Sequence, residues 1–217
     1  MYISQFIIYL HFTFKTYHMN LMKLFVLLLT TLLFSIHTAQ SQSDTLTDNR
    51  DGQTYPVVQI GDQIWMAQNL NFKTEKSYCY ANKSENCEKY GRLYSWEIAN
   101  EVCPNGWHLA TDKEWMDLEA ELGMNPADTA KGDVWRGTDQ GIQLAEGGTS
   151  GFNAKFGGYR NPPSNYFLEN MHTFFWTATV SKGGYRVWYR QLIKGDGKIM
   201  RHNQPKSWGM YVRCVKD

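Results

Sequence analysis

The segment Cys103–Trp115 constrains the fold of this chain most, because a cysteine, a turn, a strand and a helix start follow one another there. Asn105-Gly106 is a strong turn dipeptide, since both residues tolerate positive φ. Trp107–Leu109 then predicts a short extended segment. Thr111 followed by Glu114 forms a capping-box pattern, in which the two residues satisfy free amides of a first helical turn.

The helix that starts after Thr111 is expected to run to about Leu122. Trp115, Leu118 and Leu122 recur at helical spacing, and Gly123 is a natural stop. Five carboxylates on this helix are interpreted as capping or solvent-facing residues: Asp112, Glu114, Asp117, Glu119 and Glu121.

Short strands are predicted on both sides of this helix. A hairpin is expected over residues 55–66, with Gly61-Asp62 as its turn, and a first helix is expected to open at Tyr90–Trp96. Three later segments have the composition of strands in an antiparallel sheet: 174–179, 185–192 and 209–215. Two helices amid short antiparallel strands predict an α+β fold.

The N-terminal forty residues have the pattern of a secretory signal peptide. Lys23 precedes an apolar run over residues 24–36, and Ala39-Gln40-Ser41 suits cleavage. This run is too short for a hydrocarbon core of ~30 Å, which needs about 20 residues. A retained membrane anchor is the alternative to a cleaved signal. No cysteine follows the run closely, so no lipid attachment is predicted, and we expect a secreted or cell-surface protein.

The expected organisation is a leader over 1–40, a flexible stretch over 41–50 and one domain over 51–217. Removing the leader takes away Lys15 and Lys23, two of the 22 basic residues, and leaves 20 bases against 21 acids. A mature chain so close to neutral argues against nucleic acid or an anionic membrane as a partner. No stable membrane span is expected in the mature chain.

Four cysteines are present, at Cys79, Cys87, Cys103 and Cys214, and three pairings are open to them. Export favours disulfides over a metal site, and the absence of a C-x-x-C pair makes a zinc site a weak hypothesis. Cys79 and Cys87 enclose a polar loop that needs a local crosslink. We therefore prefer the pairs Cys79–Cys87 and Cys103–Cys214.

Six segments together resemble a known family. They are Ile60–Asn71 (IGDQIWMAQNLN), Tyr90–Trp96 (YGRLYSW), Cys103–Trp115 (CPNGWHLATDKEW), Gly151–Arg160 (GFNAKFGGYR), Phe175–Thr179 (FWTAT) and Val212–Asp217 (VRCVKD). The family is the Fibrobacter succinogenes major paralogous domain, and the resemblance covers nearly the whole expected domain in the family's order.

The resemblance implies a fold like that of the C-type-lectin-like superfamily, which also includes formylglycine-generating enzymes. Such a domain has two helices, short antiparallel sheets, termini brought together and a long irregular loop region. A Cys103–Cys214 bond fits this arrangement. Family members are typically exported or surface proteins of bacteria such as Bacteroidetes, so the same location is expected here.

Two activities of that superfamily are not expected. Calcium-dependent lectins use an EPN or QPD triplet and a WND triplet, but here Gln204-Pro205 is followed by Lys206, which would repel the cation, and no Trp-Asn-Asp occurs. No cofactor is therefore expected, and calcium stays open without its usual motifs. Formylglycine-generating enzymes need a redox pair of cysteines, whereas all four cysteines here are assigned to structural bonds.

No catalytic residue is predicted. His108, between Trp107 and Leu109, is interpreted as a packed structural residue, and His172 as a loop residue. No G-x-S-x-G motif is present, and a Ser-His-Asp triad, which is assembled in space, is left open.

The candidate ligand-binding residues lie where the resemblance places the long loop region. Aromatic rings stack on apolar sugar faces, while arginine and asparagine donate to hydroxyls. The alternative is an ordinary surface loop in which the tyrosine and arginine of the segment serve the fold. The expected ligand-binding residues are Tyr159, Arg160, Asn161, Asn165, Tyr166 and His172.

The sequence thus favours an exported, non-catalytic binding module that recognises glycan or protein at the bacterial cell surface. One alternative is an enzyme on a formylglycine-generating-enzyme-like scaffold, which a free thiol would favour and fully oxidised cysteines would disfavour. Another is a structural component of a surface assembly, in which Trp188 and Trp208 face partner chains.

Overall fold

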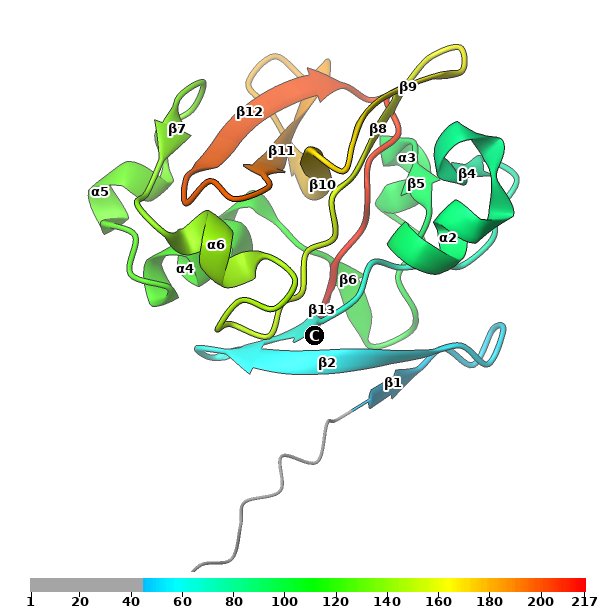
Figure 1. Ribbon diagram of the computed structural model, residues 1–217, viewed down its shortest axis with the longest axis horizontal. Helices are drawn as coiled ribbons and strands as arrows, with labels where there is room; N and C mark the ends of the chain where they lie inside the picture. The colour runs from blue at the N-terminus through cyan, green and yellow to red at the C-terminus, as the bar shows by residue number, and fades with distance from the viewer. Residues whose placement is uncertain (1–44) are drawn as a thin grey trace, which may run out of the picture. The chain divides into compact units, whose positions relative to one another are not determined.

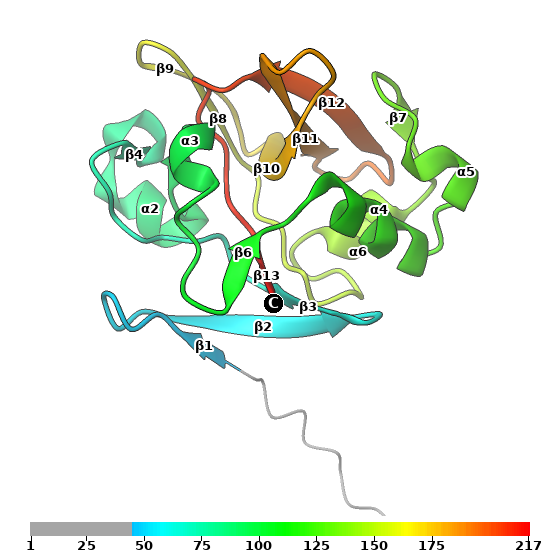
Figure 2. The same ribbon diagram turned by 180° about the vertical axis from the view of Figure 1, so that it is seen from behind.

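The computed structural model of the protein describes residues 45–217 (Figures 1 and 2). The expected signal peptide over 1–40 and its apolar run lie outside these residues. The strands are β1 (Thr45–Thr47), β2 (Thr54–Ile60), β3 (Gln63–Met66), β4 (Ser77–Tyr78), β5 (Leu93–Tyr94), β6 (Trp107–Leu109), β7 (Trp135–Arg136), β8 (Gly157–Asn161), β9 (Asn165–Glu169), β10 (His172–Val180), β11 (Arg186–Ile193), β12 (Ile199–Pro205) and β13 (Cys214–Lys216). The helices are η1 (Tyr80–Asn82), α2 (Ser84–Tyr90), α3 (Trp96–Ala99), α4 (Asp112–Glu121), α5 (Pro126–Thr129) and α6 (Gln140–Leu144).

The first sheet joins segments from both ends of the domain, in the order β1-β2-β3-β13-β6. Val215 of β13 pairs with Trp65 on one side and with His108 on the other. The predicted hairpin is confirmed, because β2 and β3 pair around the turn at Gly61. Figure 1 shows β2 below the rest of the domain, and Figure 2 shows the chain's end beside β3. The ends of the domain therefore meet, as the resemblance implied.

Residues 45–50 belong to this sheet and its first turn, which corrects the expectation of a flexible stretch over 41–50. β1 pairs with β2 from Thr45–Pro56 to Thr47–Thr54. The carboxylate of Asp48 is buried, and Arg50 donates to it at 2.6 Å. The sequence did not predict this strand because its residues are polar. Main-chain pairing and a buried ion pair hold it in place, and neither needs apolar side chains.

The second sheet has the order β7-β12-β11-β10-β8-β9. β10, β11 and β12 form an antiparallel meander, and β8 joins β10 in parallel at Gly158 and Thr173. The predicted strands at 174–179 and 185–192 are confirmed. The third, 209–215, is a strand only at its end, since Gly209–Tyr211 make isolated bridges instead.

The predicted helix after Thr111 is confirmed as α4. The Glu114 amide donates to Thr111 Oγ1 at 3.2 Å, and the Thr111 amide donates to the Glu114 carboxylate at 2.7 Å, so the capping box is complete. Gly123 follows with a φ of +93°, a left-handed conformation that suits a helix end. Two carboxylates of α4 differ from the expectation of a solvent-facing position. Asp112 and Glu119 are buried against arginines of the second sheet.

The helix predicted to open at Tyr90–Trp96 is confirmed only from Trp96 onward, as α3, and is wrong for the residues before it. Tyr90 ends α2, residues 93–94 pair with β4, and α3 has only four residues. α2 instead begins in the segment expected to be a polar loop. Asn86, Cys87 and Tyr90 form the buried face of this helix. Strands outnumber helices, which is compatible with the α+β class. None of the helices between residues 45 and 217 is long and apolar enough to cross a membrane.

Aromatic side chains build the centre of the core. Trp65, Trp115, Phe152 and Phe175 are fully buried, with neighbouring ring centroids 5.0–5.7 Å apart. Most of these pairs meet edge to face, the geometry that aromatic rings prefer. Tryptophan thus serves the core at these positions.

Both preferred disulfides are confirmed. Cys79 and Cys87 are bonded, with S–S 2.01 Å, and Cys103 and Cys214 are bonded, with S–S 2.07 Å. The first connects the segment before η1 to α2, and the second ties the chain before β6 to β13. No cysteine of the chain is free.

Candidate functional site

The six residues predicted to bind ligand lie on strands, which corrects their expected place in a long irregular loop. β8 and β9 pair from Gly157–Glu169 to Asn161–Asn165 and form a hairpin. The short strands and the prolines between them gave the pattern of a loop. The structure places Tyr159, Arg160 and Asn161 on β8, Asn165 and Tyr166 on β9, and His172 at the start of β10.

The hairpin points these side chains to opposite faces. On one face, Tyr159 stacks on Trp208, with centroids 4.8 Å apart and rings inclined by 8°. On the other, Arg160 lies over the ring of Tyr78 at 3.8 Å, and the Tyr166 hydroxyl donates to Asn82 at 2.6 Å. The aromatic and cationic groups therefore serve packing, and they do not form one site.

His172 also has a structural contact. Its Nδ1 lies 2.7 Å from the Gln191 amide nitrogen, and its ring stacks on Phe174. Partial burial lowers the pKa of His172 from its ordinary value, so the ring favours the neutral form. Phe174 also packs against Tyr159, with centroids 4.8 Å apart, so this ring connects His172 to the Tyr159 face of the hairpin.

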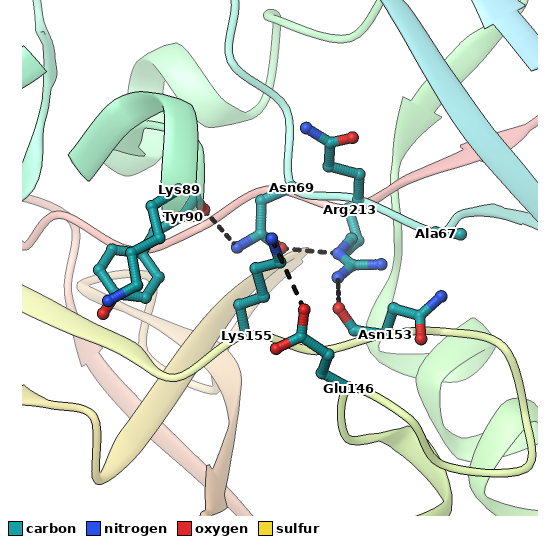
Figure 3. Close-up of a pocket in the computed structure, with 9 residues that line it drawn as sticks. Ala67, Asn69, Lys89, Tyr90, Glu146, Asn153, Lys155 and Arg213 are labelled. Carbon is teal, nitrogen blue, oxygen red and sulfur yellow. Dashed lines mark hydrogen bonds and ion pairs between the residues drawn. The ribbon is translucent and has the colours of Figure 1, made fainter. Parts of the chain in front are cut away.

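A polar pocket lies elsewhere, between the end of α2, the chain after β3 and the loop between α6 and β8 (Figure 3). It has two chambers: the one lined by the buried Arg213, here called inner, has a volume of about 330 Å³, and the one lined by Lys194, here called outer, has about 550 Å³. Both chambers share Lys89, Tyr90, Glu146 and Lys155 as lining residues. The inner chamber adds Ala67, Gln68, Asn69, Asn153 and Arg213, and the outer adds Ala145, Phe156, Asn170, Lys194 and Gly195. We call the two chambers together the basic pocket.

The floor of the basic pocket is a fixed network around Arg213 (Figure 3). Arg213 Nε donates to Asn69 Oδ1 at 2.7 Å, and Asn69 Nδ2 donates to the Tyr90 carbonyl at 2.7 Å. Arg213 also donates to the carbonyls of Met66 at 2.7 Å and Asn153 at 3.1 Å. Burial lowers the pKa of Arg213 to about 9, so the group is still protonated at neutral pH.

The two lysines at the rim of the pocket are not held by close ion pairs. Lys89 Nζ lies 4.5 Å above the ring of Tyr90, and Lys155 Nζ lies 3.6 Å from Glu146. The Tyr90 hydroxyl is within hydrogen-bond distance of Glu169 at 3.1 Å and of Asn170 at 3.0 Å. Exposed cations and amides are thus available to a ligand at the mouth, above a preorganised floor.

Sequence reasoning missed the basic pocket because its residues come from several separate segments of the chain. Lys89 follows the segment that Cys79 and Cys87 enclose, and Lys155 lies in the segment Gly151–Arg160. Neither lysine has a sequence pattern that predicts a site. One signal was present: Arg213 interrupts an otherwise apolar run, Met210–Val215. A cation inside a buried strand needs partners, and following those partners leads to the pocket.

No metal site emerges from residues 45–217, in which no three side chains among His, Cys, Asp and Glu are grouped to hold an ion. Gln204-Pro205 lies at the end of β12, and Lys206 follows it. The expectation of no cofactor, with calcium left open, stays a prediction.

One protein-family comparison matches this chain. The model described as the Fibrobacter succinogenes major domain covers residues 58–216. No curated protein and no solved structure matched. The match spans every segment that lines the basic pocket.

Proposed function

The chain belongs to the Fibrobacter succinogenes major domain family, and we propose that it is an exported, non-catalytic module that binds glycan at the bacterial cell surface. A C-type-lectin-like fold is part of this proposal. A surface protein is the alternative partner. Neither calcium nor another cofactor is required by the proposed binding mode.

The basic pocket is the observation that carries this proposal. Its inner chamber of about 330 Å³ has the size of small-molecule sites, which begin at about 300 Å³. The Gln68 amide can both donate to and accept from sugar hydroxyls, and the Asn170 amide can donate to them while its Oδ1 accepts from Tyr90. Such a lining suits a polar, hydroxyl-rich ligand better than an apolar one.

The cysteines favour a binding module over a thiol enzyme. A formylglycine-generating-enzyme-like reaction needs a redox-active cysteine pair, and each cysteine of this chain is bonded within the domain. Both bonds connect separate segments of the fold, which is the role of a structural crosslink.

The structural-component alternative is weakened by the contacts of its two tryptophans. Trp208 stacks on Tyr159, and the Arg201 guanidinium lies 3.5 Å over the ring of Trp188. Both rings are half-buried, so each already has a partner inside the domain.

A glycan array with protein made from the full chain tests the proposal, once with calcium and once with a chelator. We expect binding in both conditions, and we expect Lys155→Ala in the pocket to abolish most of it. Asn165→Ala at the tip of the β8–β9 hairpin is the control and should bind like the original protein.

Loss of binding in chelator would reveal a calcium site. Loss in Asn165→Ala but not in Lys155→Ala would move the site to the hairpin. Absence of binding to every glycan would contradict the proposal and favour a protein partner.

A further inference from the structure

The basic pocket gathers positive charge in a chain that is nearly neutral. The chain has 22 basic and 21 acidic residues, yet Lys89, Lys155, Lys194 and Arg213 line the pocket against Glu146 alone. Glu169 lies close by, where it accepts from the Tyr90 hydroxyl. Four bases against these two acids leave a net positive site, and a concave wall concentrates its field.

Arg213 is a buried cation that the described chain does not neutralise. Three other buried arginines have acidic partners: Arg136 and Arg190 donate to Glu119 at 2.8 and 2.6 Å, and Arg201 donates to Asp112 at 2.7 Å. The hydrogen bonds of Arg213 all go to neutral oxygens, of the Asn69 amide and of three main-chain carbonyls. Burying an unpaired charge is costly, and an anion in the chamber above would offset part of that cost.

The lysines at the rim, rather than Arg213, are placed to contact such an anion directly. Arg213 is only 1% exposed, and its guanidinium lies between Asn69 and Asn153, so its charge acts on the pocket without direct access to a ligand (Figure 3). Lys89 is exposed, and Lys155 is 38% exposed with a loose 3.6 Å contact to Glu146. Close charged hydrogen bonds measure about 2.7–2.9 Å, so Lys155 can exchange Glu146 for a ligand without losing a strong bond.

The rest of the lining selects the kind of anion. Phosphate and sulfate sites are typically built from arginine forks or from main-chain amides at helix starts, and the pocket opens beside the end of α2 instead. Here flexible ammonium groups stand beside amide side chains, which suit one carboxylate and several hydroxyls. We propose that the basic pocket binds a uronic acid residue of an acidic glycan, with Lys89 and Lys155 at its carboxylate. This inference rests on the proposed function of glycan binding.

The test compares a galacturonate trisaccharide with its methyl ester, which keeps the sugar and removes the charge. Calorimetry on protein made from the full chain should show binding of the acid and at least tenfold weaker binding of the ester. Binding of the acid should weaken as salt rises, since partly exposed charges are screened.

Three variants test the assigned side chains. Lys89→Gln combined with Lys155→Gln should weaken binding of the acid about tenfold or more, which corresponds to about 1.4 kcal/mol. Glu146→Gln should strengthen it a few fold, because it removes a competing carboxylate from Lys155. Lys182→Gln is the matched control: Lys182 lies in the β10–β11 turn, at the opposite end of that hairpin from Lys194, and should change nothing.

Each other result overturns the inference in a recognisable way. Equal binding of acid and ester would overturn the carboxylate contact and leave glycan binding in place. Stronger binding of a sulfated trisaccharide, or full displacement by inorganic phosphate at equal concentration, would overturn the choice of anion. No binding of acidic or neutral oligosaccharides would overturn the glycan function together with this inference.

Discussion

Asp112 accepts a hydrogen bond from Arg190 at 2.6 Å, although the two residues lie 78 positions apart. The bond ties the first residue of α4 to β11 in the second sheet. Arg201 of β12 reaches the same carboxylate at 2.7 Å, so one acid joins a helix to two strands. α4 is therefore held on the sheet by buried charge as well as by the aromatic core beneath it.

Replacing Asp112 with alanine should strongly destabilise the protein. The change leaves Arg190 and Arg201 buried without their shared carboxylate, and breaking a buried pair typically costs about 3–5 kcal/mol. Asp117→Ala on the same helix is the control, since its exposed contact with Lys113 is worth about 1 kcal/mol or less. Urea denaturation measures both, and similar losses in the two variants would contradict a special role for Asp112.

The same carboxylate should make stability sensitive to acid. Burial raises the pKa of Asp112, but hydrogen bonds and charges from Arg201 and Arg190 outweigh burial, and the net shift is downward. A lowered folded pKa stabilises the protein above the unfolded value of about 3.9, and this contribution is lost as pH falls through the folded pKa. The free energy of unfolding should therefore fall below about pH 4.

The variant Asp112→Asn checks the origin of this acid sensitivity. Its side chain does not titrate, so its free energy of unfolding should depend less steeply on pH below about 4 than that of the original protein. Equal slopes in the two proteins would assign the acid sensitivity to other carboxylates.

Local signals explain what the sequence could predict. The capping box of Thr111 and Glu114 and the turn at Gly61 act within a few residues, so their patterns hold in the folded protein. α2 was missed because its buried side consists of Asn86, Cys87 and Tyr90 rather than aliphatic residues, which weakens the periodic signal. Its position inside a disulfide-closed segment also favoured the interpretation as a loop.

The candidate site could not be predicted, because it depends on long-range packing. Asn69 and Arg213, which form its floor, are 144 positions apart. The six predicted residues were chosen by chemical type within one segment, but strand pairing divides Tyr159 and Arg160 between two faces. None of the six lines the basic pocket, because residue type alone does not determine which side chains the fold brings together.

The two disulfides should contribute unequally to stability. In the chain-entropy model, the 111-residue separation of Cys103–Cys214 corresponds to about 5 kcal/mol, and the 8-residue separation of Cys79–Cys87 to about 2.5 kcal/mol. Paired alanine substitutions at each bond, compared by denaturant unfolding, measure the difference. A larger loss on removing the shorter crosslink would show that native-state packing, not loop closure, sets their value.

His108 should titrate above an ordinary histidine, and His172 below it. His108 lies 2.7 Å from both Asp217 and Glu114, so it is a half-exposed, ion-paired residue rather than the packed one expected. Partial burial lowers the pKa of His108, but the hydrogen bonds that its ring donates to Asp217 and Glu114 outweigh burial, and the net shift is upward. Within residues 45–217 no acid forms an ion pair with His172, and burial lowers its pKa. An NMR titration in which both fall on the same side of about 6.5 would contradict this order.

The raised pKa of His108 also predicts how stability changes near neutral pH. A raised folded pKa stabilises the protein fully below the unfolded value of about 6.5, and the contribution is lost as pH rises through the folded pKa. Because His108 is more than a third exposed, solvent screening limits the effect to about 1 kcal/mol or less. His108→Gln should remove this decline in the free energy of unfolding, and Asp217→Asn should reduce it by lowering the pKa of His108. If His108→Gln keeps the full decline, the loss of stability comes from another titrating group.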